Sequence, residues 1–245
     1  MNAFEIAALS MDSDQQRLTG ISQNLANVQT PGYKRTVTAQ RPFAAVIALA
    51  QAAADSPADA VADADTRLDM SPGALRPSSN PLDLAAGGDG FFEFETPNGP
   101  ALSRQASLHV DALGRLVNDA GLAVRSDHGE LLVPLPVGAL RIDAQGEVFA
   151  DDRSLGRLLL SRAGEPTRLQ SLGAGLYRPA AGDATQPVDA PQVLSGQREA
   201  SNVSSSAEMV RLMETARHFE AMAKVAQGYD EAMDKAIRKL GDLGS

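Results

Sequence analysis

The chain of 245 residues carries a formal net charge of −9, has 4 % aromatic residues and contains no cysteine. The missing cysteines exclude disulfides, thiolate nucleophiles and zinc sites built on cysteine. Residues 1–36 hold three acids and three bases, and residues 206–245 hold seven acids and six bases, so the excess negative charge lies between the two ends. No broad basic face is expected, which argues against nucleic acid as a partner.

The first segment has the apolar spacing of a helix with one narrow seam. Three- and four-residue steps separate its apolar side chains, and Asp14 is the one interruption. A stop signal follows at residues 30–33, where Pro31 and Gly32 occupy the central positions of a predicted type II turn. The seam residues are Phe4, Ala7, Met11, Leu18, Ile21, Leu25 and Val28.

The last segment repeats this pattern over a longer stretch. Ser205 stands three residues before Glu208, which is the spacing of a capping box at a helix start. Acid-first pairs at i and i+4, such as Glu231 with Lys235, favour the helix on its solvated face. We expect a helix of about 30 residues or more. Its seam residues are Met209, Leu212, Ala216, Phe219, Ala223, Ala226, Met233, Ile237 and Leu240, interrupted by Asp230.

The residues between the two helices divide into two stretches. Residues 44–65 are half alanine with scattered aspartate, which indicates a linker or a loosely held helix. From about residue 68 to 194, short apolar runs alternate with turn pairs such as Asn98-Gly99, which predicts a small antiparallel β domain. The apolar runs expected to form strands include residues 91–94, 131–133 and 157–160.

No set of residues supports catalysis, so we expect no enzyme, no cofactor and no metal. The glycines at 87, 88 and 90 lack the Lys-Ser or Lys-Thr that a phosphate loop requires. Asp83 and Asp89 could form a carboxylate pair, although nothing predicts a cleft around them. The histidines at 109, 128 and 218 share no metal-ligand spacing.

The two apolar seams allow two arrangements. They could pair with each other and close a helical hairpin within one chain, as in a cytoplasmic coiled-coil adaptor. They could also pair with seams of other copies and drive polymerisation. A heptad seam specifies a partner helix but not the chain that supplies it, so this pattern leaves both arrangements open.

Three blocks of residues resemble the flagellar rod and hook axial protein family. Residues 24–35 read NLANVQTPGYKR and resemble the family's N-terminal signature. Residues 81–92 (PLDLAAGGDGFF) and 103–121 resemble its β domain. Residues 201–203, 208–209 and 216–220 (ARHFE) resemble its C-terminal helix. Departures from the family pattern are Ala86, Leu102 and Leu108, where we expect changed core packing.

The resemblance implies a structural subunit of the flagellar basal-body rod. The chain length leaves room for one domain beyond the helices, as in rod subunits, and residues 216–220 are most similar to the proximal-rod member; the distal-rod member is the alternative. The implied partners are other copies, neighbouring rod subunits and the flagellar export apparatus. The N-terminus has no signal-peptide pattern, so export without a cleaved signal, to the rod crossing the periplasm, is expected.

The resulting fold prediction is α+β, with terminal helices that pair in a coiled-coil-like polymerising layer around a mainly antiparallel β domain. The expected divisions are 1–36, a linker at 37–66, the β domain at 67–195, and 196–245. The family implies termini that are disordered before assembly, in agreement with the marginal stability of isolated narrow-seam helices. The predicted assembly interface comprises Leu18, Ile21, Leu25, Val28, Pro31, Gly32, Met209, Leu212, Phe219 and Met233.

Overall fold

The computed structural model describes residues 3–38, 66–136, 138–151, 153–180 and 182–242. The chain divides into two compact units. The helical unit comprises Met1–Ala26, Thr36–Arg67 and Ser204–Ser245, and the β unit comprises Asn27–Arg35 and Leu68–Val203. Most of the predicted linker lies outside the described residues. Residues 27–35, which the sequence placed with the first helix, belong to the β unit.

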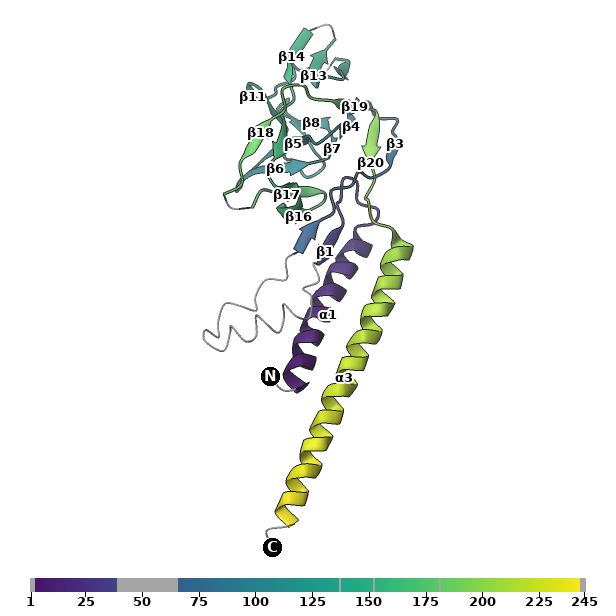
Figure 1. Cartoon of the computed structure of the whole chain (residues 1–245). Coiled ribbons are helices and arrows are strands. Elements are labelled where there is room, and N and C mark those ends of the chain that lie inside the picture. Colours follow the sequence, from purple (N-terminus) through teal and green to yellow (C-terminus); the bar gives the residue numbers. More distant parts are fainter. Residues whose placement is uncertain (1–2, 39–65, 137, 152, 181, 243–245) are drawn as a thin grey trace. The chain divides into compact units, whose positions relative to one another are not determined.

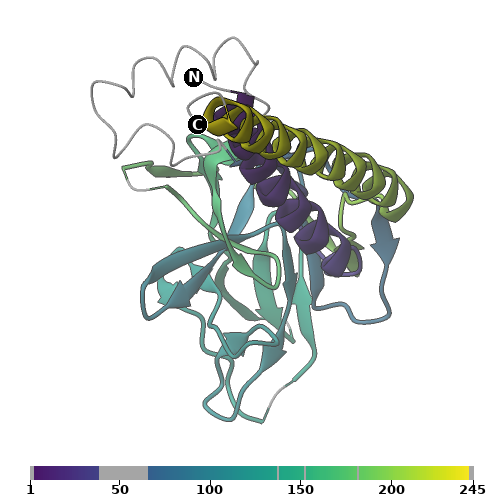
Figure 2. The ribbon, with the colours of Figure 1, turned by 90° about the horizontal axis from the view of Figure 1, so that it is seen from below.

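The helical unit is built on two helices that lie side by side (Figures 1 and 2). They are α1 (Ala3–Ala26) and α3 (Ser205–Asp242), which begins at the serine of the predicted capping box. With 38 residues against 24, α3 extends past the N-terminal end of α1 (Figure 1). The short strands β1 (Thr36–Thr38) and β2 (Thr66–Leu68) form a two-stranded sheet.

The β unit contains a six-stranded sheet in the order β16-β17-β6-β5-β15-β18, whose recorded strand pairs are antiparallel. The β5–β6 hairpin turns at Pro97 and Asn98, and Gly99, with a φ of +101°, begins β6 opposite Thr96. The Asn98-Gly99 pair thus marks the hairpin, with the turn one residue earlier than the pair predicts. The six strands are β5 (Phe91–Thr96), β6 (Gly99–Ser103), β15 (Leu160–Ala163), β16 (Gln170–Gly173), β17 (Leu176–Arg178) and β18 (Thr185–Pro187).

Smaller sheets complete the β unit. One three-stranded sheet has the order β19-β4-β7 and another β12-β13-β14, and the pairs β20-β3, β8-β9 and β10-β11 stand alone. A short 3-10 helix covers Pro166–Arg168. The strands are β3 (Leu75–Pro77), β4 (Asp83–Ala86), β7 (Gln105–Ser107), β8 (His109–Val110), β9 (Leu116–Val117), β10 (Arg125–Ser126), β11 (Gly129–Glu130), β12 (Leu140–Ile142), β13 (Glu147–Ala150), β14 (Arg153–Arg157), β19 (Val193–Ser195) and β20 (Gln197–Glu199).

The β unit buries two apolar clusters. The larger one contains Phe92 and Phe94 with leucine and valine side chains from most of the sheets, and the smaller one is centred on Phe91 and Tyr177. All three family departures are buried: Ala86 and Leu108 belong to the larger cluster and Leu102 to the smaller one. These three positions therefore lie in the core, where the sequence predicts changed packing.

Two of the three predicted strand runs differ from the structure. Residues 91–94 form most of β5, as expected. Residues 131–133 form no strand, and Leu132 makes only an isolated bridge with Arg115. The run 157–160 is divided, because Arg157 ends β14 and Leu160 begins β15, which belongs to another sheet. An apolar run indicates that its residues are buried, but it does not show where a strand begins or with which strand it pairs.

Candidate functional site

The turn that follows α1 is an integral part of the β unit. Backbone N–H of Tyr33 donates to the carbonyl of Thr30 at 3.3 Å, and Gly32 has a φ of +70°, which agrees with the predicted type II turn. Backbone N–H of Gly32 also donates to the carbonyl of Glu199 at 2.8 Å. The turn residues of the N-terminal signature are thereby held by the last strand of the β unit.

A buried ion cluster lies directly after this turn. Lys34 Nζ lies 2.6 Å from Glu199 Oε1, and Arg104 Nε lies 3.3 Å from Glu199 Oε2. Lys34 Nζ also donates to the Ser71 carbonyl at 2.9 Å, and backbone N–H of Gly73 donates to Glu199 Oε1 at 2.9 Å. One carboxylate thus neutralises two buried cations, which is the condition under which buried charges are tolerated.

Arg104 and Tyr177 extend this cluster. The guanidinium of Arg104 donates to the carbonyls of Gly90 and Ala86 and lies 5.4 Å from the centre of the Phe91 ring. The Tyr177 hydroxyl accepts from backbone N–H of Lys34 at 2.6 Å and donates to the Gly32 carbonyl at 3.2 Å. Tyr177 is therefore the side chain that satisfies both backbone groups flanking Tyr33.

The pKa shifts in this cluster follow from burial. Burial lowers the pKa of Lys34 below its ordinary value of 10.5, while the hydrogen bond and charge of Glu199 act in the opposite direction. Burial also raises the pKa of Tyr177 above its ordinary value, so the phenol keeps its proton and can donate to Gly32. The cluster's side chains are buried and bond to backbone groups, so the cluster holds the backbone around the turn.

Asn202 ties the same segment to the end of the β unit. Its Oδ1 accepts from backbone N–H of Arg35 at 2.7 Å, and its Nδ2 donates to the carbonyls of Asp69 and Ser71. Asp69 accepts from the Ser71 hydroxyl at 2.6 Å, and that bond lowers the pKa of Asp69, aided by Ser71 N–H and the Arg35 charge and opposed by burial. Residues of the first and third signature regions meet in these contacts.

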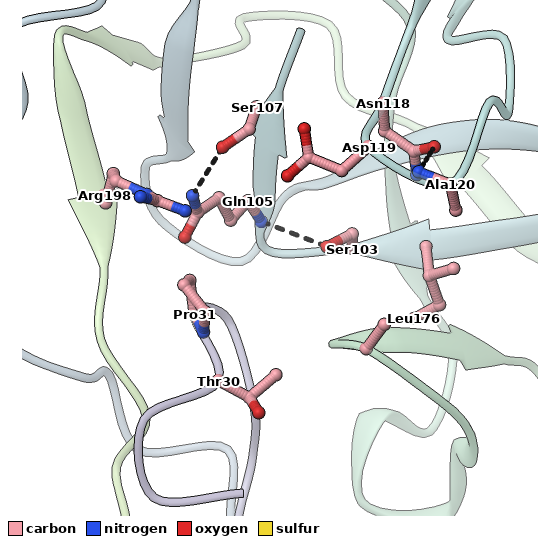
Figure 3. A pocket seen from close by; sticks show the side chains of 11 residues that line it. Thr30, Pro31, Ser103, Gln105, Ser107, Asn118, Asp119, Ala120, Leu176 and Arg198 are labelled. Carbon is pink, nitrogen blue, oxygen red and sulfur yellow. Dashed lines mark hydrogen bonds between the residues drawn. The ribbon is translucent and has the colours of Figure 1, made fainter.

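A pocket of about 200 Å³ borders the turn (Figure 3). Thr30 and Pro31 line one side, while Gln105, Ser107 and Arg198 line another. The Gln105 amide and Ser107 hydroxyl lie 3.2 Å apart, and Ser103 Oγ accepts from backbone N–H of Gln105. Ser107 is bonded to the Gln105 side-chain amide, and Ser103 Oγ donates to the Gly175 carbonyl. In the described residues neither hydroxyl has a bond to a general base of the kind that activates a serine nucleophile.

The carboxylate pair considered from sequence is not assembled. Asp83 is buried and accepts from the Ser78 hydroxyl at 2.5 Å, with Arg198 3.8 Å away. Asp89 lines a groove of about 750 Å³ whose lining does not include Asp83. The described residues contain no group of three or more acids and histidines suited to a metal ion. Within the same part of the chain, no helix is long and apolar enough to cross a membrane.

In the helical unit, polar contacts connect α1 with α3. His218 Nδ1 lies 2.5 Å from Asp14 Oδ2, and Asn24 Nδ2 lies 3.4 Å from Glu208 Oε2. The partner numbers rise along one helix and fall along the other, so α1 and α3 run antiparallel. The carboxylates of Asp14 and Glu208 are buried, and each also contacts an arginine on its own helix, Arg17 and Arg211.

The predicted interface residues are distributed over both units. Val28, Pro31 and Gly32 belong to the β unit, and the others belong to the helical unit. Ile21 is buried, whereas Met209 and Met233 expose about half their surface, at 48 and 47 %. Leu18, Leu25, Leu212 and Phe219 are half-buried. The side chains of Ile237 and Leu240, which end the predicted seam, lie outside the described residues.

Sequence reasoning missed the polar residues that hold these segments. Asp14 was noted only as a break in a seam, yet a charged residue at a seam position is a signal that a partner such as His218 faces it. Lys34 and Arg104 carried no signal beyond their place in the signature blocks, and Glu199 lies outside those blocks. Their partners are far away in the chain, so no local pattern marks them.

Comparison with known proteins gives two family models and a set of close relatives. Residues 85–150 match the flagellar hook protein FlgE/F/G D1 domain, and residues 194–239 match the C-terminal region of the flagellar basal body rod FlgEFG proteins. The flagellar basal-body rod protein FlgF of Escherichia coli is 31 % identical, with 96 % of each chain covered. The chain belongs to the flagellar basal-body rod protein family.

Two further relatives agree with this assignment. FlgF of Caulobacter vibrioides is 28 % identical over 99 % of both chains, and FlgG of Bacillus subtilis is 27 % identical over 93 % of this chain and 94 % of its own. Both rod proteins are thus matched over nearly their full length. The family is a structural component of the flagellar rod and not an enzyme family, as the sequence predicts.

Proposed function

We propose that this chain is a structural subunit of the proximal flagellar rod, which polymerises through a coiled-coil-like layer of its terminal helices. Family membership over nearly the whole chain carries the proposal. The contacts between α1 and α3 agree with a helical layer built from both ends of the chain. The proposed partners are other copies, neighbouring rod subunits and the export apparatus, with no role for nucleic acid or a small-molecule substrate.

The proposed location is the rod where it crosses the periplasm, reached by export without a cleaved signal peptide. In this account the β unit needs none of the helical unit's residues for its core, because both apolar clusters consist of β-unit side chains. The helices can therefore order at assembly, and the β unit can fold before it.

The proposal is tested by charges placed in the helix seam. Leu212→Asp and Leu25→Asp each bring a charge to a half-buried position, which the layer cannot bury unpaired. We expect cells that carry either variant to lose rod assembly and swimming. The β-sheet signal in the circular dichroism spectrum of the purified chain should be retained. Leu113→Asp, at an exposed position of the β unit, is the matched control and should swim normally. Normal assembly of both seam variants would exclude the seam as the interface.

The distal rod is the second candidate, because FlgG relatives match the chain at nearly the same identity as FlgF relatives. Complementation distinguishes the two. The chain should restore swimming to cells that lack their FlgF gene and fail in cells that lack their FlgG gene; the reverse result would assign it to the distal rod.

The non-flagellar alternative is a cytoplasmic adaptor whose terminal helices close permanently on each other. Hydrogen exchange of the purified monomer separates it from the rod subunit. An adaptor would protect the amides of α1 and α3 as strongly as those of β5, whereas the rod account predicts rapid exchange in the helices and slow exchange in the β unit.

A further inference from the structure

The β unit is assembled from two separate pieces of the chain. The short piece is Asn27–Arg35 and the long piece is Leu68–Val203, and the residues between them belong to the helical unit. Tyr33 and Lys34 of the short piece are only 4 and 1 % exposed, as little as side chains of the hydrophobic core. The long piece therefore encloses the end of the short one.

Hydrogen bonds of 2.6 to 3.4 Å join backbone groups of residues 32–35 to the long piece. They run from Gly32 N–H to the Glu199 carbonyl, from Lys34 N–H to the Tyr177 hydroxyl, from Arg35 N–H to Asn202 Oδ1, from the Tyr177 hydroxyl to the Gly32 carbonyl, from Asn202 N–H to the Tyr33 carbonyl and from Asp69 N–H to the Arg35 carbonyl. Peptide-binding domains hold extended ligands in this way, with main-chain hydrogen bonds for affinity and side-chain pockets for specificity. We call the receiving site, formed by Asp69, Tyr177, Glu199 and Asn202, the slot.

Lys34 supplies the specific side-chain contact in the slot. Its ammonium group meets the carboxylate of Glu199, which also bonds to Arg104 and to backbone N–H of Gly73. Without Lys34, Glu199 and Arg104 would still form a balanced ion pair within the long piece. The acceptor for Lys34 is therefore held in place by the long piece itself, and a cation is the side chain that suits it.

The apolar core is built without the short piece. Among the described residues, the side chains of both apolar clusters come from the long piece, and residues 27–35 contribute to neither. Hydrogen bonds and an ion pair hold the short piece instead. Segments that lie outside a core can open separately, with a smaller free energy than global unfolding requires. The contacts thus allow the long piece to keep its core while the slot is empty.

We infer that the long piece is a peptide-binding module, that Gly32–Arg35 is the ligand of its slot, and that filling of the slot is a separate, reversible last step in the folding of the β unit. The core of the long piece forms first, and the short piece then enters. A partner that captured residues 32–35 in an extended form would compete with the slot and leave the β unit with its core formed and its slot empty.

Hydrogen exchange of the purified full-length chain tests the separate step. Opening of the slot should expose the amides of Gly32, Lys34 and Arg35 together, whereas amides in β5 exchange only when the core opens. We expect the three slot amides to be protected, but less strongly than those of β5. Protection equal to that of β5 would overturn the inference, because the slot would then open only with the core. Exchange as fast as in a free peptide of the same sequence would overturn it too, because the slot would be empty.

A variant with an emptied slot tests whether the core stands without the short piece. Lys34→Asp places a second carboxylate beside Glu199, and two like charges cannot both be buried there. We expect the β-sheet signal in circular dichroism to unfold in one cooperative transition, at a lower temperature than in the wild type. Loss of the cooperative transition would show that the core needs the short piece and would overturn the inference.

Tyr177→Phe shows whether the slot empties as a unit. In the wild type this change should lower the melting temperature, because the hydroxyl bonds to Gly32 and Lys34. In the Lys34→Asp chain it should lower it no further, since both partners have left. Arg168→Asp, at an exposed position of the long piece, is the matched control and should preserve the effect of Tyr177→Phe. An equal effect of Tyr177→Phe in all three chains would contradict the inference.

A synthetic peptide supplies the most direct test. Residues 27–36 (NVQTPGYKRT), carrying a fluorescent label, would be added to the full-length Lys34→Asp chain. We expect saturable binding and a raised melting temperature, because the peptide binds the folded chain only. The wild-type chain should bind it far less, since its own segment is tethered beside the slot. The same peptide with Lys34→Asp is the matched control and should not bind.

Two outcomes of the peptide experiment would overturn the inference. One is no binding to a Lys34→Asp chain that still unfolds cooperatively, and the other is equal binding of the two peptides. These measurements use the purified chain and do not involve rods, so the slot can fail while the proposed function holds. If cells without the gene build complete rods, the proposed function fails and the slot is unaffected.

Discussion

Lys34 and Glu199, 165 residues apart in the chain, form an ion pair in which both side chains are about 1–2 % exposed. The pair joins the N-terminal signature to the strand that leads into α3. Because Glu199 also holds Arg104 and receives backbone N–H of Gly73, loss of its charge affects four segments of the β unit at once.

Glu199→Gln should therefore be strongly destabilising. The variant removes the one negative charge that Lys34 and Arg104 share, and breaking a buried pair in this way typically costs about 3–5 kcal/mol. Chemical denaturation, monitored by the β-sheet signal in circular dichroism, would measure this loss of unfolding free energy. Glu231→Gln, which breaks the exposed pair with Lys235, should change stability by about 0.5 kcal/mol or less. Equal stability of the two variants would show that the cluster is not a structural centre.

Gly32 should tolerate alanine less well than a glycine of similar conformation. A Cβ at Gly32 would lie 3.3 Å from Gln105 Cβ at a φ of +70°, whereas Gly121, with a φ of +75°, has open space around it. Both changes to alanine carry the left-handed conformational cost of about 1–2 kcal/mol, and Gly32→Ala adds the close contact. We expect Gly32→Ala to have the lower melting temperature, and the reverse order would mean that the turn is not tightly held.

The structure also predicts an acid-sensitive contribution from Asp69. Hydrogen bonds from Ser71 lower the pKa of its carboxyl below the ordinary value of 3.8, so the folded state prefers the ionised form. The stabilisation is present above about pH 4 and is lost as the pH falls through the lower folded pKa. Asp69→Asn should thus melt below the wild type at neutral pH, with a gap that narrows in acid.

Melting temperatures between about pH 2.5 and pH 7 would measure this gap. Asp119→Asn, at an exposed position in another loop, is the control. The difference between its melting temperature and that of the wild type should stay constant across this pH range. A constant gap for Asp69→Asn over the whole range would contradict the assigned role of the carboxylate.

Asp14 and His218 should show energetic coupling. Removal of His218 leaves the buried Asp14 carboxylate, among the described residues, with its long contact to Arg17 at 3.5 Å, so His218→Ala should cost about 1–3 kcal/mol. In a double-mutant cycle with Asp14→Ala, we expect the combined loss to fall short of the two single losses by about 1 kcal/mol. Because the proposed function has the helices order at assembly, thermal dissociation of isolated rods built from each variant would measure it. Strict additivity would mean that the two side chains do not interact in the assembled layer.

The elements that local patterns determine were the ones that sequence could predict. Seam spacing identified both terminal helices, Pro31-Gly32 located the turn, and Asn98-Gly99 located a hairpin. Apolar runs were less informative, because residues 157–160 divide between two sheets and residues 131–133 pair only at one bridge. Contacts between residues far apart in the chain, such as Lys34 with Glu199, leave no local sequence pattern, so they could be identified only from the three-dimensional structure.

The same limit applies to the candidate site. The sequence placed Met209 and Leu212 on one seam, but the structure half-buries Leu212 and leaves Met209 half exposed. Heptad spacing cannot reveal that a helix has a second apolar face, because both faces share the same residue types. The polar residues Asp14 and Asn24 interrupt or border the seam and were invisible as partners until the helices were placed together.

Electron cryotomography of basal bodies in cells that carry an in-frame deletion of this gene tests the central claim most directly. The account predicts rods that are missing or that stop near the inner membrane, with restoration by the wild-type gene. Complete rods and hooks in the deletion strain would contradict the rod role and favour the cytoplasmic adaptor instead.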